Sequence, residues 1–169
     1  NKSWEDLVRT EIFEKLDLKS AGFGAPGEIG KLTQPVGHNF LPLQKSQKAF
    51  YIGKDNTDNP SVLGPAGTIH ISASDMLKYT KARATRNNII SAKSWEILET
   101  PPFGGNYALG VIKRDDGGIW HNGSNTLWYA EFIYYPKTQK CAFVDCNYGN
   151  LPRVQPKINE ILLSAIAAA

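Results

Sequence analysis

The strongest constraint on the fold is a change of hydrophobic period in the C-terminal half of the sequence, where polar and apolar side chains begin to alternate with a period of two. Three stretches there predict strands: Tyr107 to Lys113, Leu127 to Tyr135 and Lys140 to Cys146. Turn-forming residues follow the first two, because 115–118 reads Asp-Asp-Gly-Gly and 136–139 reads Pro-Lys-Thr-Gln. Strands joined in this way predict an antiparallel meander.

Helical patterns lie on both sides of these strands. Four helices are predicted: from Ser3 to about Gly22, from Ser72 to about Arg86, from Ser91 to Glu99, and from Pro156 onward. A serine stands at the N-cap position of the first three, and proline suits the first helical position of the last. Helices packed against an antiparallel sheet make the expected fold class α+β.

Residues 23 to 66 have no regular hydrophobic period and are rich in Gly, Pro, Asn and Asp. We therefore expect an ordered loop region, and a loop of this length in a compact domain usually serves or covers a site. The chain has 169 residues, of which 41% are apolar, so it is long enough to bury a core as one domain over residues 1–169.

Charge and composition exclude several functions. The net charge of +3 is spread along the chain without a basic block, so nucleic acid is not an expected partner. Cys141 and Cys146 lie in one predicted strand with side chains expected on opposite faces, so a disulfide between them is not expected. No cysteine or histidine spacing marks a metal site, and no cofactor is predicted. No apolar run reaches the roughly 18 residues that span a membrane.

The polar run His121-Asn122-Gly123-Ser124-Asn125 stands just before the aromatic strand. One interpretation is a plain turn, since Asn and Gly are common turn residues. The other is a cleft wall, where a strand presents backbone N–H groups to a ligand and glycine leaves room for its approach. The residues alone favour the turn, and Ala66-Gly67 with the capped helix upstream reverse that preference through the resemblance that they carry.

Three segments follow one another in a recognisable order: Ser3 to Leu16, then Gly64-Pro65-Ala66-Gly67 leading to the capped helix at Ser72, then Tyr107-Ala108-Leu109-Gly110 running into Trp120-His121-Asn122-Gly123. Together they resemble the serine β-lactamase-like and penicillin-binding hydrolases of the class C type, with their D-alanyl-D-alanine peptidase, D-aminopeptidase and esterase relatives. The last segment is similar to the third catalytic motif of that family, which is Lys-Thr-Gly in many β-lactamases and His-x-Gly in many relatives. The resemblance implies the C-terminal half of a β-lactamase/transpeptidase-like fold and acyl transfer through a serine.

The chain departs from the family at the nucleophile. No serine has a lysine three residues later, so the Ser-x-x-Lys motif is missing, and Tyr148-Gly149-Asn150 spells the Tyr-x-Asn motif only after the third motif, where it is interpreted as a loop. We therefore expect a C-terminal portion that is inactive alone and is completed by an N-terminal portion as a second polypeptide. The start at Asn1, without methionine or a signal peptide, fits a processed or cut chain, and the resemblance implies a periplasmic or secreted location.

The resemblance also implies roles for the polar run. The backbone N–H of Ser124 corresponds to one oxyanion donor, and His121 replaces the family's lysine, either assisting proton transfer or binding a substrate carboxylate. Asn122, Gly123 and Asn125 are the expected contacts to a small-molecule or peptide substrate with an amide or ester bond. Trp128 draws interest because it lies just beyond this run.

Two other functions stay open. The missing nucleophile fits a non-catalytic ligand-binding module of the same fold. The strand from Lys140 to Cys146 is an edge rich in Ala, Phe and Val, which fits an interaction domain that dimerises through it.

Overall fold

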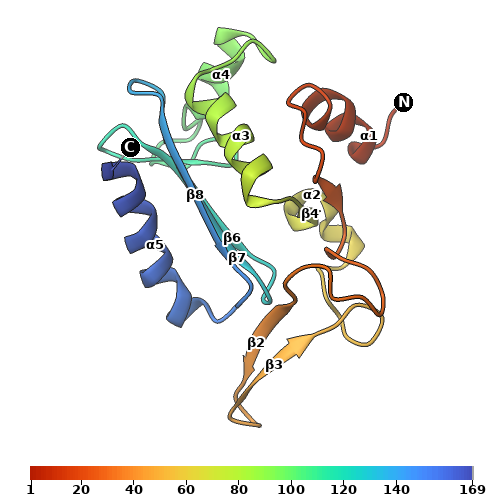
Figure 1. Ribbon diagram of the computed structural model, residues 1–169. Coiled ribbons are helices and arrows are strands. Elements are labelled where there is room, and N and C mark those ends of the chain that lie inside the picture. The colour runs from red at the N-terminus through yellow and green to blue at the C-terminus, as the bar shows by residue number, and fades with distance from the viewer. Residues whose placement is uncertain (169) are drawn as a thin grey trace.

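The computed structural model describes residues 1–168 and shows helices packed on an antiparallel sheet, which confirms the predicted α+β class (Figure 1). The helical elements are α1 Trp4–Val8, a π-helix Arg9–Phe13, a 3-10 turn Ser61–Leu63, α2 Gly64–Gly67, α3 Ala73–Ala84, α4 Ala92–Glu99 and α5 Leu151–Ala168. The strands are β1 Gly22–Phe23, β2 Gly37–Leu41, β3 Ser46–Phe50, β4 Ile69–His70, β5 Ile112–Lys113, β6 Ile119–Ser124, β7 Tyr129–Tyr135 and β8 Lys140–Cys146.

The main sheet has four strands in the order β5-β6-β7-β8, all antiparallel, so the predicted meander is confirmed. The predicted strand from Tyr107 to Lys113 is wrong for most of its length. The backbone turns at Gly110, whose φ is +79°, and the N–H of Ala108 donates to the carbonyl of Val111 at 2.8 Å. Because φ > 0 suits glycine and not an extended strand, only Ile112 and Lys113 remain as β5.

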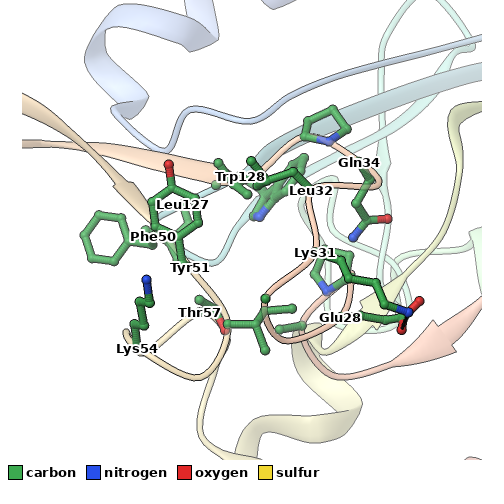
Figure 2. Close-up of a pocket in the computed structure, with 18 residues that line it drawn as sticks. Glu28, Lys31, Leu32, Gln34, Phe50, Tyr51, Lys54, Thr57, Leu127 and Trp128 are labelled. Atoms are coloured by element: carbon green, nitrogen blue, oxygen red, sulfur yellow. Dashed lines mark hydrogen bonds and ion pairs between the residues drawn. The ribbon is translucent and has the colours of Figure 1, made fainter.

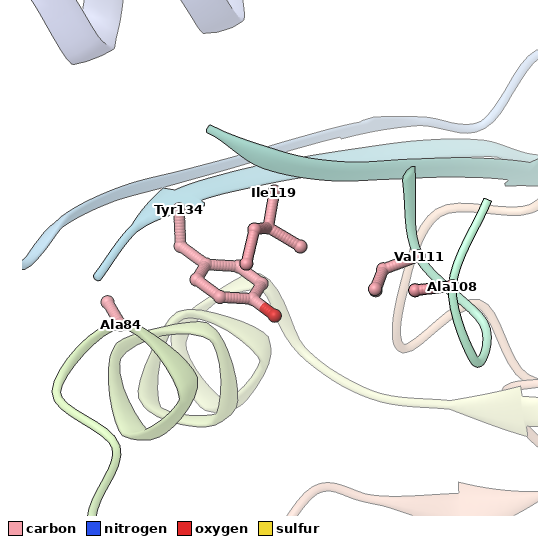
Figure 3. Packing of buried hydrophobic residues seen from close by; sticks show 5 residues of the cluster. All are labelled: Ala84, Ala108, Val111, Ile119 and Tyr134. Atoms are coloured by element: carbon pink, nitrogen blue, oxygen red, sulfur yellow. The ribbon is translucent and has the colours of Figure 1, made fainter. Parts of the chain in front are cut away.

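The sheet is covered on both faces by helices. On one face, Ile119 and Tyr134 pack with Ala84 of α3 and with Ala108 and Val111 from the turn before β5 (Figure 3). On the other face, Leu162 of α5 packs against side chains of the neighbouring strands, namely Ile133 and Ala142 with Trp120 beside them. Since side chains alternate along a strand, neighbouring residues of β6 and of β7 point to opposite faces of the sheet.

The last helix begins earlier than its sequence predicts. It starts at Leu151, and Pro156 lies inside it rather than at its first position. The carbonyl of Asn150 accepts the N–H groups of Arg153 and Val154, which forms the first turn ahead of the proline. Burial of Ile158 and Leu162 against the sheet offsets the hydrogen bond that proline lacks.

The region from 23 to 66 is more regular than expected. It contains the β2–β3 hairpin, in which five residue pairs from Gly37↔Phe50 to Leu41↔Ser46 are in register. The hairpin projects from the rest of the fold (Figure 1), and its turn holds Lys45 at a φ of +50°. The expectation of a region without strands is therefore wrong here, because the pairing partner and not a period-two pattern defines these strands. The first helix also ends early, at Phe13 rather than near Gly22.

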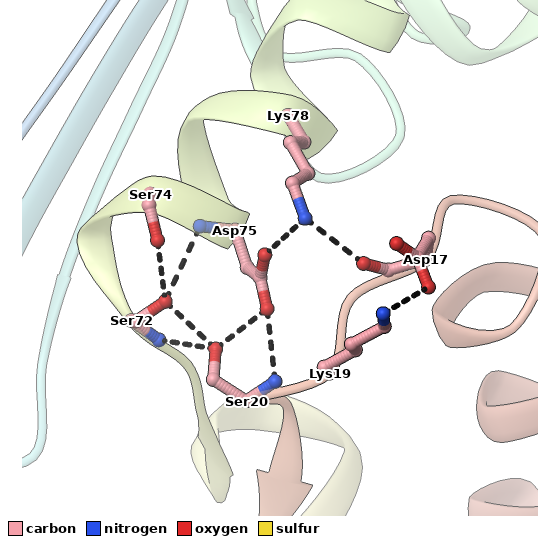
Figure 4. A network of polar contacts seen from close by, with 7 residues as sticks. All are labelled: Asp17, Lys19, Ser20, Ser72, Ser74, Asp75 and Lys78. Atoms are coloured by element: carbon pink, nitrogen blue, oxygen red, sulfur yellow. Dashed lines mark hydrogen bonds and ion pairs between the residues drawn. The ribbon is translucent and has the colours of Figure 1, made fainter.

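The predicted caps of α3 and α4 are confirmed. Ser72 Oγ accepts the N–H of Asp75 at 3.3 Å, and Ser91 Oγ accepts the N–H of Ser94 at 3.1 Å. Asp75 does more than favour the helix start. Its buried carboxylate is held by Lys78 at 2.7 Å and by the N–H and hydroxyl of Ser20 at 2.8 and 2.7 Å, which ties α3 to the segment after the first helix (Figure 4).

These contacts predict an acid-dependent loss of stability. The hydrogen bond from Lys78, followed by those from Ser20, lowers the pKa of Asp75 from its ordinary 3.8 to about 2. A lowered folded-state pKa means that the contribution is complete above about pH 4 and is lost as the pH falls through about 2. The difference in free energy of unfolding between the native chain and Asp75→Asn, measured in urea, should shrink between pH 5 and pH 2. A difference that stays constant over this range would contradict the prediction.

Other expectations concern what the fold does not contain. Across residues 1–168, no helix is both long and apolar enough to cross a membrane, and no cluster of three potential metal-ligating side chains occurs. Cys141 and Cys146 are both free thiols. The outer edge of β8 pairs with no other strand within the described residues, while α3 and α5 cover its faces.

Candidate active site

The polar run forms the end of β6, in the interior of the sheet order. β7 pairs with β6 along its whole length, from Ile119↔Tyr134 to Ser124↔Tyr129. β5 pairs only with Ile119 and Trp120 on the other side. Within residues 1–168, the β6 edge from 121 to 124 therefore has no strand partner, and its outward backbone N–H and C=O groups are free to bind an extended ligand.

His121 lies on the α3 face of the sheet at the start of this open edge. Its Nε2 is 3.0 Å from the hydroxyl of Tyr107, and the two rings meet edge to face. Burial lowers the pKa of His121 from 6.5, and a hydrogen bond to the backbone of Asn122 opposes that shift only in part. The imidazole is therefore mainly neutral at pH 7, so it offers one donor and one acceptor rather than a fixed positive charge.

Gly123 and Ser124 form the most accessible part of the run. Both are exposed, and a Cβ built on Gly123 meets no atom within 4 Å. The hydroxyl of Ser124 accepts the N–H of Thr126 at 3.0 Å, so its side chain supports the turn that follows. The open surroundings of Gly123 leave room for a ligand to approach the backbone.

The side chain of Asn122 points to the opposite face from His121, because neighbouring residues of a strand alternate. Its Nδ2 donates to the hydroxyl of Tyr129 at 2.8 Å, and that hydroxyl donates to Glu131 Oε2 at 2.8 Å. Burial raises the pKa of Tyr129 to about 12, so the phenol keeps its proton and remains a donor. Tyr129 and Glu131 therefore hold the Asn122 side chain on the face of the sheet opposite to His121.

Glu131 is the centre of this supporting network. Its carboxylate is 1% exposed and accepts Trp120 Nε1 at 2.7 Å and Asn159 Nδ2 at 2.8 Å, besides the hydroxyl of Tyr129. These donors come from β6, β7 and α5. A buried charge with several donors is stabilised by all of them together, so Glu131 joins the back of the candidate site to the last helix.

Asn125 organises the turn between β6 and β7. Its Oδ1 accepts the N–H groups of Leu127 and Trp128 at 3.2 and 3.1 Å, and its Nδ2 is 3.3 Å from Asp58 Oδ1. This side chain connects the turn to the loop before α2. Its amide is engaged within the chain, as is that of Asn122, and their substrate contacts stay a prediction.

The comparison with known proteins agrees with this arrangement. The Beta-lactamase family model matches residues 1–165. The chain belongs to the beta-lactamase family. This confirms the resemblance found in the sequence and accounts for the α+β architecture with helices on both faces of an antiparallel sheet. No curated protein matches the sequence.

Solved structures of low sequence identity share this beta-lactamase fold. D-amino acid amidase from Ochrobactrum anthropi SV3, complexed with L-phenylalanine amide, matches at a TM-score of 0.73 and 17% identity, over 99% of this chain and 52% of that chain. The penicillin binding protein from Bacillus halodurans matches at 0.71 and 18%, over 94% and 50%. The D-stereospecific amidohydrolase from Streptomyces sp. matches at 0.65 and 15%, over 93% and 48%. The chain thus spans about half the length of these three structures.

The beta-lactamase fold brings together only part of the predicted site. His121, Gly123 and the backbone of Ser124 share the open edge of β6, whereas the side chains of Asn122 and Asn125 serve the framework. Sequence reasoning missed three partners, namely Tyr107 beside His121, Glu131 behind the strand and Asp58 beside Asn125. A buried acid in the aromatic strand was the one available signal for Glu131, since a carboxylate there needs donors.

Proposed function

We propose that the chain forms the C-terminal side of the cleft of a serine hydrolase that acts on an amide or ester through an acyl-serine intermediate. The observation that carries the proposal is the open edge of β6, with free space around Gly123 and the His121–Tyr107 pair beside it. The nucleophilic serine comes from polypeptide outside this chain, which holds no Ser-x-x-Lys motif.

Each group at the edge has a role in this proposal. The backbone N–H of Ser124 donates to the substrate carbonyl oxygen as negative charge develops there. His121, neutral at pH 7, exchanges a proton with the hydroxyl of Tyr107 or with a group that replaces it when the cleft is complete. A neutral imidazole favours this role over the binding of a substrate carboxylate. The backbone of Gly123 lines the path of the substrate, and Asn122 and Asn125 contribute contacts at its sides.

The substrate class rests on the relatives. Two of the structures with this fold are named as a D-stereospecific amidohydrolase and a D-amino acid amidase, and both names describe amide chemistry. We extend amide or ester hydrolysis to this chain on that basis. We also propose a periplasmic or secreted location, as the family resemblance implies.

Active-site labelling tests the proposal. The chain should be mixed with its N-terminal portion and treated with a fluorophosphonate probe that labels reactive serines, and mass spectrometry should then locate the label. We expect one labelled serine outside residues 1–169, and no labelled serine when the chain is alone. A label on a serine of this chain would contradict the proposal, and no label in the completed protein would favour a non-catalytic binding module.

Replacement of His121 tests the proton-transfer role. His121→Ala should lower kcat of the completed enzyme by about 100-fold, which is the lower end of general acid–base effects. His121→Gln is the matched control, because it keeps a hydrogen bond to Tyr107 but cannot exchange a proton near pH 7. The native enzyme should keep its kcat at pH 7 and lose it as the pH falls through the lowered pKa of His121. In both variants, kcat should no longer show this decrease at acidic pH. Unchanged kinetics would show that His121 has no such role.

The open edge of β8 favours a second candidate function, assembly with another polypeptide. Unpaired backbone groups along Lys140 to Cys146 are a template for an added strand. Sedimentation of the chain tests self-assembly directly. A dimer whose β8 amides are protected from hydrogen exchange would support it, and a monomer with exchanging β8 amides would exclude it.

A further inference from the structure

A cavity of about 220 Å³ lies beside the turn that follows β6 (Figure 2). The 25–37 loop, the 50–57 segment and Leu127–Trp128 form its walls. Six of the residues that line it have large apolar or aromatic side chains: Leu32, Val36, Phe50, Tyr51, Ile52 and Trp128. None of the roles proposed above uses this space.

The wall at Trp128 is rigidly placed by close packing. Gly37 is buried, and a Cβ at this position would lie 2.7 Å from Trp128 Nε1 and 2.8 Å from the Cβ of Leu127. The N–H of His38 donates to the carbonyl of Leu127 at 3.2 Å. β2 therefore fits against the β6–β7 turn with no room for a further side-chain atom, so this wall of the cavity is preformed.

The cavity is also joined directly to the candidate site. Asn125, the last residue of the polar run, accepts the N–H groups of both Leu127 and Trp128, so one wall of the cavity is fixed to the end of β6. Asp58, adjacent to the lining residue Thr57, contacts the same asparagine at 3.3 Å. The wall formed by Leu127 and Trp128 thus follows Gly123 in the β6–β7 turn.

The volume of the cavity and the charges along its walls define which chemical group it can bind. Pockets that enclose whole drug-sized ligands have volumes of about 300–1,000 Å³, so this one suits a single substituent. Lys31 is paired with Glu28 at 2.5 Å at the rim, which neutralises both charges there. Lys54 is the one other charged residue of the lining, and most of the remaining lining residues are apolar. An apolar group would gain by leaving water there.

We propose that this cavity is the specificity pocket of the site, and that it takes an uncharged apolar substituent of the acyl substrate, the size of one aromatic ring or branched aliphatic group. The proposal rests on the proposed function for the reacting centre, but the binding of the substituent depends on this chain alone. Trp128 is the specificity-determining residue, and Tyr51 and Val36 line the same cavity.

A binding experiment on the chain itself tests the pocket without any chemistry. N-acetyl-phenylalanine amide and N-acetyl-alanine amide are matched probes that differ by one ring. In a 1H–15N NMR titration, the phenylalanine probe should shift the indole N–H signal of Trp128 saturably. The alanine probe should bind at least tenfold more weakly, since loss of a buried apolar group costs at least that much. Equal binding of the two probes, or shifts remote from Trp128, would overturn the proposal.

Two variants keep the test decisive. Trp128→Ala removes one wall, and Val36→Phe fills the cavity while leaving that wall in place; both should weaken the phenylalanine probe at least tenfold. Phe103→Ala, at a side chain 98% exposed and outside the cavity, should leave binding unchanged. Circular dichroism verifies that each variant folds. Native-like binding by a folded Val36→Phe would refute the pocket.

The outcomes also separate this proposal from the proposed function. Binding of the phenylalanine probe to the chain, with no serine labelled in the completed protein, would keep the pocket and refute the hydrolase. Labelling without selective binding would keep the hydrolase and refute the pocket. When the pocket and the hydrolase proposals are both correct, kcat/KM of the completed enzyme for a phenylalanine ester should exceed that for the alanine ester at least tenfold. Trp128→Ala should reduce this ratio.

Discussion

Replacing Gly149 by alanine is expected to lower the free energy of unfolding by about 3 kcal/mol, the upper end of typical overpacking costs. A Cβ at this buried position would lie 1.8 Å from the carbonyl oxygen of Thr126 and 2.6 Å from the amide nitrogen of Leu127. Both atoms belong to the backbone of the β6–β7 turn, which cannot rotate away as a side chain can. Gly149 also donates its N–H to the carbonyl of His38 at 2.9 Å, so the loop has little freedom to retreat.

Gly123→Ala is the matched control for this prediction. Both glycines lie beside the same turn, but a Cβ at 123 meets nothing within 4 Å, so stability should change by less than about 0.5 kcal/mol. Urea unfolding of the two variants measures the contrast. Equal stabilities would mean that the turn moves easily, which would also remove the basis for a preformed cavity at Trp128.

Glu131→Ala is expected to have the largest effect of any side-chain truncation at the site, a loss of about 4 kcal/mol. The change removes the shared acceptor of Trp120, Tyr129 and Asn159, whose donors would stay buried without a partner, and it leaves a cavity between the sheet and α5. Glu131→Gln should lose less, because it preserves the shape and one acceptor oxygen. Thermal and urea unfolding measure both variants.

Glu160→Ala is the control for the loss of a carboxylate that is exposed on α5. Glu160 lies on α5, and its exposed side chain pairs with Lys157 at 2.8 Å. Exposed pairs of this kind contribute no more than about 1 kcal/mol, so the variant should be close to the native chain in stability. A Glu131→Ala variant as stable as Glu160→Ala would refute the view that Glu131 supports the back of β6.

Local signals along the chain were sufficient for part of the fold. The N-caps Ser72 and Ser91 were predicted correctly because a cap depends on a side chain and a backbone N–H three residues away. The strand β8 was predicted with its bounds, Lys140 to Cys146. The α5 start was wrong because the buried stripe against the sheet, and not the proline, decides where this helix forms.

The β2–β3 hairpin was missed for a related reason. Its residues carry no alternating pattern, and their strand geometry arises from pairing with each other and from the contact of β2 with the β6–β7 turn. A pattern of neighbouring residues does not show which segments, distant in the sequence, pair as strands. The cavity at Trp128 was missed with it, because its walls are the segments that flank the hairpin together with the β6–β7 turn.

The sequence by itself determined the α+β class, the meander and the position of the polar run, because alternation, capping and turn chemistry act over a few residues. It also carried the family resemblance, which the match over residues 1–165 confirms. The tertiary structure alone decided which parts of that run are accessible. Alternation along β6 places His121 on the α3 face and turns Asn122 toward Tyr129 and Glu131 on the other face, and the short β5 leaves the edge of β6 from 121 to 124 without a strand partner among the described residues.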